Sequence, residues 1–309
     1  MKHNMKQFLF GMALAASAAL FAGDGLQIRT TGGWAKEPDG FSLDYGTAKK
    51  GAVYLTRNVT PHTIYRIAWR AERATPETPA PTLFVETSRK HYVQFDGANR
   101  VHYWNSGDET TLKLRFDIDR GKPGKIHLRD IRVTEVAPAE LNRNLIENGD
   151  WEQGELGDFW QSRDAGIIPG SAVLANSPDF FSGSRSLCLK PSAQKPDYTI
   201  RSAYMPVIPG DTFVLTFWGK SDVDTTLGGS IDCASPTNIH KGKHPHKIAT
   251  FKLTPDWNEY RLEYTVPRDL AAYPALADGV ARIWFSRGAK GTIYLDNLEF
   301  RRTAPATAQ

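Results

Sequence analysis

The chain has 309 residues, which is long enough for two domains of ordinary size, each with its own hydrophobic core. Its formal net charge of +4 is spread along the sequence without a basic block, and this argues against a nucleic-acid partner, which needs a concentrated positive surface. Beyond the first residues, no segment is apolar enough to predict a transmembrane helix.

The beginning of the chain predicts a secretory signal peptide. Residues 1–6 are basic, and residues 8–20 form an apolar run that is too short to span a bilayer. We place the cleavage site near Ala22, so residues 1–22 are expected to be removed. No cysteine follows that could carry a lipid. We therefore expect a protein that is secreted, or that lies in the periplasm or at the cell surface.

Residues 26–136 predict a first β-domain. Short apolar runs alternate there with turn residues, and no stretch keeps a helical period. The clearest strand covers residues 112–116, in which Leu112, Leu114 and Phe116 share one face.

Residues 144–303 predict a second β-domain, after a short linker at residues 137–143 and before a tail at residues 304–309 that we expect to be disordered. Alternating runs at residues 260–264 and 282–286 predict two of its strands. Many short strands with turns between them are typical of a β-sandwich.

The two halves carry the same two segments in the same order. Residues 121–133 align with residues 288–300, which places Ile126, Leu128 and Ile131 on Ile293, Leu295 and Leu298. Upstream, residues 59–70 align with residues 207–218, which places Tyr65, Ile67 and Trp69 on Phe213, Leu215 and Phe217. Because both matches occur in the same order, the chain is interpreted as two copies of one β-domain.

The two cysteines, Cys188 and Cys233, both lie in the second half. An exported protein meets an oxidising compartment, in which disulfides persist. The sequence leaves two outcomes open: a disulfide that ties two strands of the second domain, or two buried and unpaired thiols.

A set of motifs covers nearly all of the second half. They lie at residues 144–152 (NLIENGDWE), 182–187, 207–210, 212–220, 254–260 and 291–298. In this order they resemble the carbohydrate-binding modules of families 4, 9 and 22, which belong to the galactose-binding-like β-sandwiches. The first half is similar only through residues 59–70 and its closing strand. The resemblance implies an all-β fold of two tandem jelly-roll β-sandwiches, in which the first copy is divergent.

The same resemblance implies a structural calcium ion in the second domain, where the opening and closing strands meet. Its implied ligands are Glu152, Asp296, Asp150 and backbone oxygens near Ser184 and Arg185. Such oxygens suit Ca²⁺, which takes about six to eight of them. Without the motifs around them, Glu152 and Asp296 would be interpreted as surface carboxylates at turns. In the first copy Arg129 replaces Asp296, so we expect no calcium there, and either a salt link or a changed loop in its place.

Two tryptophans of the second domain, Trp218 and Trp284, are predicted to face away from the core. Their neighbours on the strand take the inward face: Phe213, Leu215 and Phe217 around Trp218, and Ile283 and Phe285 around Trp284. An exposed indole can bury the flat C–H face of a sugar. The alternative is that each ring packs beneath a loop.

Three more residues complete the expected sugar contacts. Arg282 lies beside Trp284, and His240 lies in a loop with three histidines and three lysines that could border the groove. A solvated loop is favoured there over a zinc site, because the lysines repel a cation. In the first domain Trp104 is the weaker candidate.

We expect a secreted, non-catalytic protein that binds a polysaccharide or another glycan. No G-x-S-x-G elbow, H-E-x-x-H pair or phosphate loop is present, and the two domains use the whole mature length. Two alternatives stay open. One is an envelope-associated scaffold that contacts other secreted enzymes or envelope proteins. The other is a polysaccharide-active enzyme whose site has no recognised motif.

Overall fold

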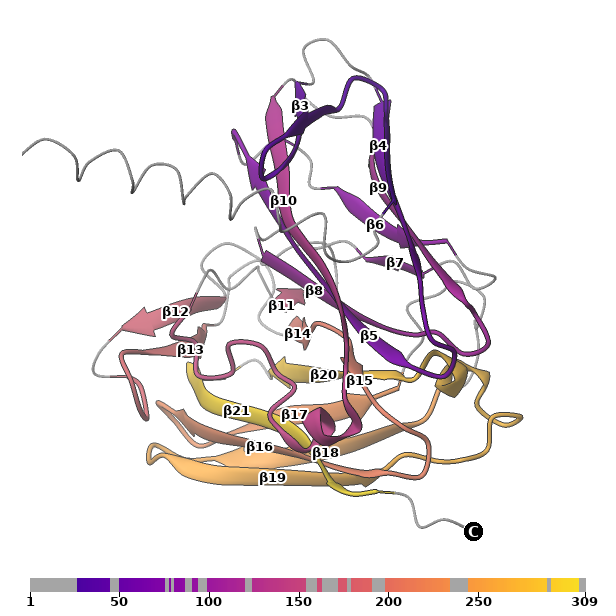
Figure 1. Cartoon of the computed structure of the whole chain (residues 1–309). Coiled ribbons are helices and arrows are strands. Elements are labelled where there is room, and N and C mark those ends of the chain that lie inside the picture. Colours follow the sequence, from indigo (N-terminus) through magenta and orange to yellow (C-terminus); the bar gives the residue numbers. More distant parts are fainter. Residues whose placement is uncertain are drawn as a thin grey trace, which may run out of the picture.

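The computed structural model describes residues 27–44, 50–75, 78, 81–86, 91–93, 99–119, 124–153, 160–162, 172–176, 179–190, 198–233, 244–287 and 290–305. Within these ranges the chain is all β apart from two 3₁₀ turns, and it forms two β-sandwiches, one from each half (Figure 1). The predicted fold class is therefore confirmed. The described part of the chain contains no helix long and apolar enough to cross a membrane. The expected signal peptide lies outside the described residues.

The first sandwich is made of two antiparallel sheets. Sheet A has the order β1-β4-β9-β6-β7, and sheet B has the order β2-β3-β10-β5-β8. The strands are β1 (Gln27–Thr31), β2 (Ala35–Glu37), β3 (Gly40–Asp44), β4 (Lys50–Asn58), β5 (Ile64–Arg73), β6 (Thr82–Val85), β7 (His91–Val93), β8 (Asn99–Asn105), β9 (Thr111–Asp119) and β10 (Lys125–Glu135).

The second sandwich repeats this plan. Sheet C has the order β11-β14-β20-β17-β18, with β15 paired to β20, and sheet D has the order β12-β13-β21-β16-β19. The strands are β11 (Trp160–Ser162), β12 (Ala172–Asn176), β13 (Arg185–Leu189), β14 (Tyr198–Ser202), β15 (Met205–Pro206), β16 (Thr212–Ser221), β17 (Thr225–Asp232), β18 (His246–Leu253), β19 (Asn258–Thr265), β20 (Val280–Arg287) and β21 (Ile293–Ala304). The 3₁₀ turns are η1 (Pro138–Asn142) and η2 (Pro274–Asp278).

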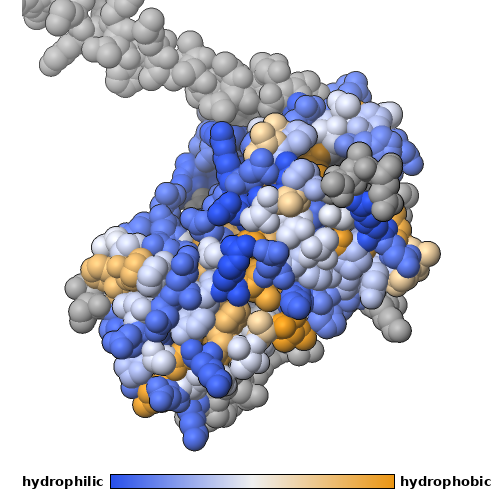
Figure 2. Space-filling model, turned by 90° about the horizontal axis from the view of Figure 1, so that it is seen from below, coloured by the Kyte–Doolittle hydropathy of each residue, from blue (hydrophilic) through white to orange (hydrophobic). Residues whose placement is uncertain are grey.

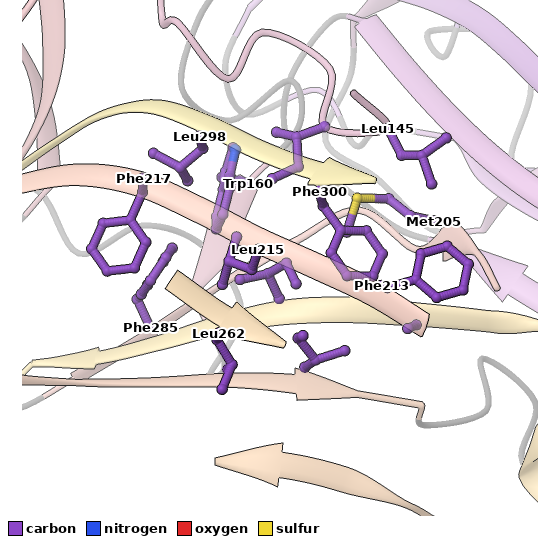
Figure 3. Close-up of a cluster of buried hydrophobic side chains, with 14 of the residues drawn as sticks. Leu145, Trp160, Met205, Phe213, Leu215, Phe217, Leu262, Phe285, Leu298 and Phe300 are labelled. Carbon is purple, nitrogen blue, oxygen red and sulfur yellow. The ribbon is translucent and has the colours of Figure 1, made fainter. Parts of the chain in front are cut away.

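Strict alternation of apolar residues builds each core. In β9, Leu112, Leu114 and Phe116 are buried as their spacing predicts. In the second sandwich, Phe213 stacks on Phe300 with ring centroids 5.3 Å apart. These rings lie among other buried aromatic and aliphatic side chains from both sheets, including Trp160, Phe217 and Phe285 (Figure 3). The apolar area removed from water is the main stabilising contribution of each sandwich.

The outer surface differs from these cores. On the face seen in Figure 2, hydrophobic residues lie in small separate patches between hydrophilic ones. Among the described residues, the large hydrophobic side chains that are exposed are Phe181, Val223, Ile248 and Leu270. These four come from separate turns and strands, so they do not by themselves define a protein-binding patch.

Both copies have a β-bulge in the closing strand. In sheet B, β10 lies third and pairs with β5, and in sheet D, β21 lies third and pairs with β16. Each closing strand is bulged, and each bulge contains a residue with positive φ, Asp130 at 54° and Asn297 at 46°. The repeat alignment pairs these two residues. Asp and Asn tolerate the left-handed region better than most residues, which suits a bulge.

The opening motif of the second half is fastened to its closing strand. The Leu145 N–H donates to the Phe300 carbonyl at 2.8 Å, and the Leu298 N–H donates to the Gly149 carbonyl at 2.9 Å. The side chain of Asn144 accepts from the Phe300 N–H at 3.0 Å and donates to the Leu298 carbonyl at 2.9 Å. Residue 149 must be glycine, because a Cβ atom there would lie 2.1 Å from the Leu298 oxygen.

The two sandwiches pack directly on one another. Ile64, Val101 and Tyr103, on the outer face of sheet B, belong to the same buried cluster as Leu145 and Met205 of the second half. At its edge, Arg66 Nη2 lies 2.6 Å from Glu147 Oε1. Burial raises the pKa of Tyr103 to about 12, with the Glu147 carboxylate adding to the effect. The part of the outer face of sheet B that carries Ile64, Val101 and Tyr103 is therefore an internal surface of the protein.

Candidate functional site

The outer face of sheet C presents Trp284. This residue lies on β20, whose inward positions Ile283 and Phe285 are fully buried. Trp284 itself is partly exposed, as the predicted alternation requires. In the sheet it pairs with Arg201 of β14 on one side and with Ser230 of β17 on the other. The strand pairing therefore surrounds the indole with polar side chains that sequence spacing could not bring together.

Guanidinium groups flank the indole of Trp284. Cζ of Arg282 lies 4.4 Å from the ring centroid, and Cζ of Arg201 lies 5.6 Å from it. Both distances are within the range of cation–π attraction. The indole N–H is shielded from solvent but has no hydrogen-bond partner among the described residues. The indole N–H groups of the buried Trp151 and Trp160 also lack a partner among the described residues, so what distinguishes Trp284 is the combination of a free donor with a partly exposed ring.

Arg282 is held in place from several sides. Its Nε lies 3.5 Å from Asp232 Oδ2, and its Cζ lies 5.1 Å from the ring centroid of Tyr204. His244 Nε2 lies 3.0 Å from Asp232 Oδ1, close enough for an ion pair although it lacks hydrogen-bond geometry. The side chains of Arg282 and Asp232 are only 13% and 8% exposed. Arg282 therefore fixes the orientation of the indole and covers part of one ring face.

Trp218 lies on a different surface. It belongs to β16 in sheet D, so it shares no face with Trp284. The ring of Phe181 stacks on it with centroids 3.7 Å apart, and Trp257 contacts Phe181 edge-on at 6.1 Å. Trp218 points away from the core as predicted, but Phe181 covers one face of its ring. For Trp218 the alternative of a ring beneath a loop therefore holds for one ring face, although local spacing could not identify Phe181 as the residue that covers it.

Two other predicted sugar contacts have different outcomes. Trp104 is 2% exposed and packs against Tyr65 in the core of the first sandwich, so its assignment to a binding surface is wrong. The error has a physical reason: both faces of β8 are buried, and it is Val101 and Tyr103 that face the second sandwich. His240 lies outside the described residues.

The two cysteines are free thiols, and both are buried. Cys188 lies on β13 of sheet D, whereas Cys233 directly follows β17 of sheet C. The sequence left open either a disulfide or two unpaired thiols, and the structure has the unpaired thiols. Burial raises the pKa of Cys233 to about 12, with a smaller contribution from Asp232, which makes this thiol a poor nucleophile at neutral pH.

Glu152 and Asp296 bind the same short loop. Glu152 Oε1 accepts the N–H groups of Ser184 and Arg185 at 2.8 and 2.9 Å, and Oε2 accepts the Ser184 hydroxyl at 2.6 Å. These bonds lower the pKa of Glu152. Asp296 Oδ2 accepts the N–H groups of Phe181 and Ser182 at 2.8 and 3.0 Å. The loop is thus held between two carboxylates that come from opposite ends of the second half.

Asp296 is fully buried, and burial raises its pKa although three N–H groups donate to it. The negative charge of Glu152 adds to this rise, so the two carboxylates repel one another. One oxygen of each carboxylate, Glu152 Oε2 and Asp296 Oδ1, accepts a single hydrogen bond from the described residues and retains acceptor capacity. The two carboxylates supply the charge and the oxygen atoms that a divalent cation prefers.

The remaining calcium ligands expected from the sequence are less well placed. Asp150 Oδ1 accepts the Glu152 N–H at 3.3 Å, and Asp150 is exposed. At Arg185 the group that faces Glu152 is the N–H, whereas a ligand would have to be the carbonyl. No group of three or more His, Cys, Asp or Glu side chains converges in the described ranges. Backbone oxygens or water would therefore have to complete any coordination shell.

The first sandwich carries arginines at the positions that correspond to Asp296 and Trp284. Arg129 forms ion pairs with Glu72 and Asp39, so of the salt link and the changed loop that the sequence left open, the structure has the salt link. Arg115, the counterpart of Trp284 on β9, forms ion pairs with Glu86 and Asp117. The two copies have therefore kept the same sheets but differ in the chemistry of their outer faces.

No protein-family model and no curated protein matches this sequence. Among solved structures, the tandem CBM22-1–CBM22-2 domains of Paenibacillus barcinonensis Xyn10C are similar over 90% of this chain and 92% of that one, with 15% identity and a TM-score of 0.38.

Two single modules are similar over about half of this chain. TmCBM61, solved in complex with β-1,4-galactotriose, has 12% identity and a TM-score of 0.36 and covers 52% of this chain and 99% of its own. A family 4 module has 20% identity and a TM-score of 0.34 and covers 51% and 99%. These neighbours are carbohydrate-binding modules, the class that the sequence motifs resemble.

Proposed function

We propose that this chain is an exported, non-catalytic protein that binds a polysaccharide on the outer face of sheet C, beside Trp284. The observation that carries the proposal is the state of this indole. It is partly exposed, arginine side chains fix its position, and its shielded N–H has no acceptor among the described residues. This combination of an apolar surface with convergent polar groups is typical of small-ligand sites.

The chemistry of this face suits a sugar ring. The part of the indole that Arg282 leaves uncovered offers apolar area to the C–H groups of a pyranose, and its N–H can donate to a hydroxyl oxygen. Ser230 lies across the strand pair from Trp284 and can both donate and accept. Because Arg282 lies over one ring face, a sugar could pack against the opposite face or along the edge of the indole.

Replacement of Trp284 by alanine tests the proposal. We expect affinity for the bound polysaccharide to fall at least tenfold, which corresponds to about 1.4 kcal/mol, because both the apolar contact and the N–H donor are lost. Affinity electrophoresis through gels that contain a panel of plant and microbial polysaccharides measures this directly. The protein itself should show no product release from the same panel.

Trp218→Ala is the matched control, because it removes an equally large ring from the opposite sheet. It should retain the affinity of the parent protein, provided that circular dichroism shows both variants to be folded. If the Trp284 variant binds as tightly as the parent, the site does not lie on sheet C. If only the Trp218 variant loses affinity, the site lies on sheet D.

A calcium ion held by Glu152 and Asp296 is the second part of the proposal. Its support is the convergence of the two carboxylates on one loop. Burial raises the pKa of Asp296, and the negative charge of Glu152 adds a smaller rise. When bound, the ion would supply positive charge to offset the repulsion between the carboxylates and would tie the opening segment to the closing strand. It would therefore act on stability, since both carboxylates lie on sheet D and its opening segment, away from Trp284.

Chelation should accordingly lower thermal stability. A ligand present at about one hundred times its dissociation constant stabilises the folded state by about 2.7 kcal/mol. We expect the melting temperature to fall by several degrees when a chelator is added and to recover with excess Ca²⁺ but not with Mg²⁺. Differential scanning calorimetry measures the shift. An identical melting temperature in chelator and in calcium would exclude the ion.

A further inference from the structure

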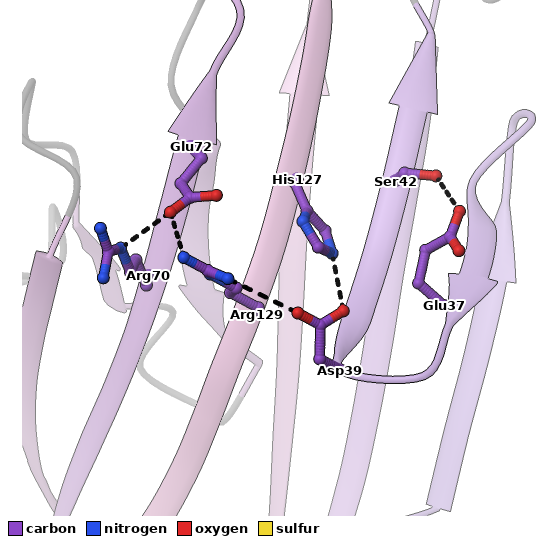
Figure 4. Close-up of polar contacts among 7 residues, drawn as sticks. All are labelled: Glu37, Asp39, Ser42, Arg70, Glu72, His127 and Arg129. Carbon is purple, nitrogen blue, oxygen red and sulfur yellow. Dashed lines mark hydrogen bonds and ion pairs between the residues drawn. The ribbon is translucent and has the colours of Figure 1, made fainter. Parts of the chain in front are cut away.

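A polar cluster covers the outer face of sheet B, at the end away from the second sandwich. It spans β3, β10 and β5 and includes the turn between β2 and β3 (Figure 4). His127 of β10 pairs in register with Ser42 on one side and with Glu72 on the other. Arg129, two residues further along β10, pairs in register with Arg70. Neighbouring strands therefore place alternating donors and acceptors side by side.

The cluster is a continuous chain of ion pairs. Arg70 Nε lies 3.1 Å from Glu72 Oε1, and the same carboxylate receives Arg129 Nη2. On its other side, Arg129 Nη1 lies 3.6 Å from Asp39 Oδ2, and His127 Nε2 lies 3.3 Å from Asp39 Oδ1. Each side chain limits the movement of the next, so the positions of the donors and acceptors are fixed before any ligand arrives.

A hollow of about 370 Å³ lies beside this cluster, and Arg70 and Arg129 are not part of its lining. Among the described residues, the hollow contains no Phe, Tyr or Trp side chain, and its lining consists of Glu37, Asp39, Ser42, Glu72, Arg73, Ala74, Lys125, Ile126 and His127. The volume is within the range of small-ligand pockets, about 300–1,000 Å³. The hydroxyl of Ser42 donates to Glu37 Oε1 at 2.8 Å, which fixes one wall of the hollow.

Three nitrogen atoms of the cluster lack a hydrogen bond. Arg70 Nε, His127 Nε2 and Arg129 Nε are shielded from solvent, yet none has a partner with hydrogen-bond geometry among the described residues. In a network of surface ion pairs, donors that are not used in the network normally form hydrogen bonds with water. Two of the three still face carboxylate oxygens, Arg70 Nε at 3.1 Å and His127 Nε2 at 3.3 Å. Arg129 Nε has no such partner among the described residues and can donate to a further oxygen atom.

The chemistry of the lining narrows the choice of ligand. Guanidinium groups adjacent to the carboxylates repel a metal ion, and no metal-binding group of side chains is found in the described part of the chain. The lining holds three carboxylates, Glu37, Asp39 and Glu72, against the two cations Arg73 and Lys125, so its charge gives an anion no net attraction. A neutral hydroxyl both donates and accepts, so it matches a surface on which carboxylates and cationic nitrogens alternate.

We propose that this hollow is a second saccharide site, which binds a neutral sugar through hydrogen bonds without aromatic stacking. It lies on the first sandwich and shares no residue with the surface around Trp284. The two sites can therefore be tested independently of one another. A chain with two such sites would bind a long polysaccharide more tightly than either site alone.

Native mass spectrometry can count the bound sugars. The probes are neutral β-linked hexasaccharides of xylose, glucose and galactose, and each is added to the intact protein, to His127→Ala and to Trp284→Ala. The parent protein should bind two copies of at least one hexasaccharide. Each variant should bind one copy. Calorimetric titration should show that the affinity of the altered site has fallen at least tenfold.

Two further variants keep the test interpretable. Arg132→Ala removes an exposed cation from the same strand outside the hollow, and it should bind two copies. Ser42→Ala changes one hydroxyl in the lining, so it should fold even if His127→Ala does not, and it should weaken the second copy only. Retention of both copies by folded His127 and Ser42 variants would overturn the proposal.

The remaining outcomes separate the two sites. A parent protein that binds one hexasaccharide, lost in Trp284→Ala, refutes the second site and leaves the proposed function intact. A single hexasaccharide lost in His127→Ala but kept in Trp284→Ala supports the hollow and refutes the surface on sheet C. Failure of all three hexasaccharides to bind refutes the second site.

Discussion

Replacing Asp296 by alanine is expected to destabilise the second sandwich by about 3–5 kcal/mol. The carboxylate is fully buried and accepts three backbone N–H groups, from Phe181, Ser182 and Asn297. Alanine would leave these donors without a partner, and each buried and unsatisfied group costs about 1–3 kcal/mol. The melting temperature should fall by about 10 °C for a domain of this size. Thermal unfolding followed by circular dichroism measures the change.

This measurement needs a matched control and a chelator. Asp224→Ala removes a carboxylate from an exposed turn of the same sandwich, so it should change stability by no more than about 0.5 kcal/mol. Adding chelator to all samples removes any contribution from calcium, and the comparison then reports the lost hydrogen bonds alone. Equal stability of the two variants under these conditions would mean that Asp296 does not hold the loop.

Gly149→Ala is expected to have the second largest effect, a loss of about 2–3 kcal/mol. The added Cβ would lie 2.1 Å from the carbonyl oxygen of Leu298, which is backbone and cannot rotate away. The opening segment would have to move off β21, and the hydrogen bond from the Leu298 N–H to the Gly149 carbonyl would weaken. Urea unfolding gives the free energy, and binding at 25 °C should persist in the fraction that remains folded.

Gly228→Ala provides the comparison for this substitution. Its added Cβ would meet the Ser286 carbonyl oxygen at 3.4 Å, an ordinary van der Waals distance, on a strand of the same sandwich. It should therefore be tolerated. A Gly149 variant as stable as the Gly228 variant would show that the opening segment contributes little to the fold.

The two copies share one sandwich fold but carry different side chains on their outer faces. On the third strand of sheets A and C, the matching outward position holds Arg115 in the first copy and Trp284 in the second. Arg115 is paired with two carboxylates, whereas Trp284 is flanked by two guanidiniums. A change on the outward face leaves the core intact, so the fold tolerates it at little cost in stability.

Several features follow from the sequence by itself. Alternating side chains identify the inward face of a strand, so Leu112, Leu114 and Phe116 are buried as predicted, and Trp218 and Trp284 are not. The duplication could also be recognised, because apolar residues at corresponding core positions of the two sandwiches recur at the same spacing. Glycine at position 149 and the anionic pair Glu152 and Asp296 could be recognised only through the motifs around them.

Other features were decided by tertiary structure alone. Alternation divides a strand into two faces, but it does not say what covers the second face. Sheet B packs on the second sandwich, which buries both faces of β8 and with them Trp104. Phe181 covers Trp218, and the cysteines lie on different sheets. The residues around Trp284 and the hollow beside His127 come from strands distant in sequence, because hydrogen-bonded register, rather than local spacing, brings them together.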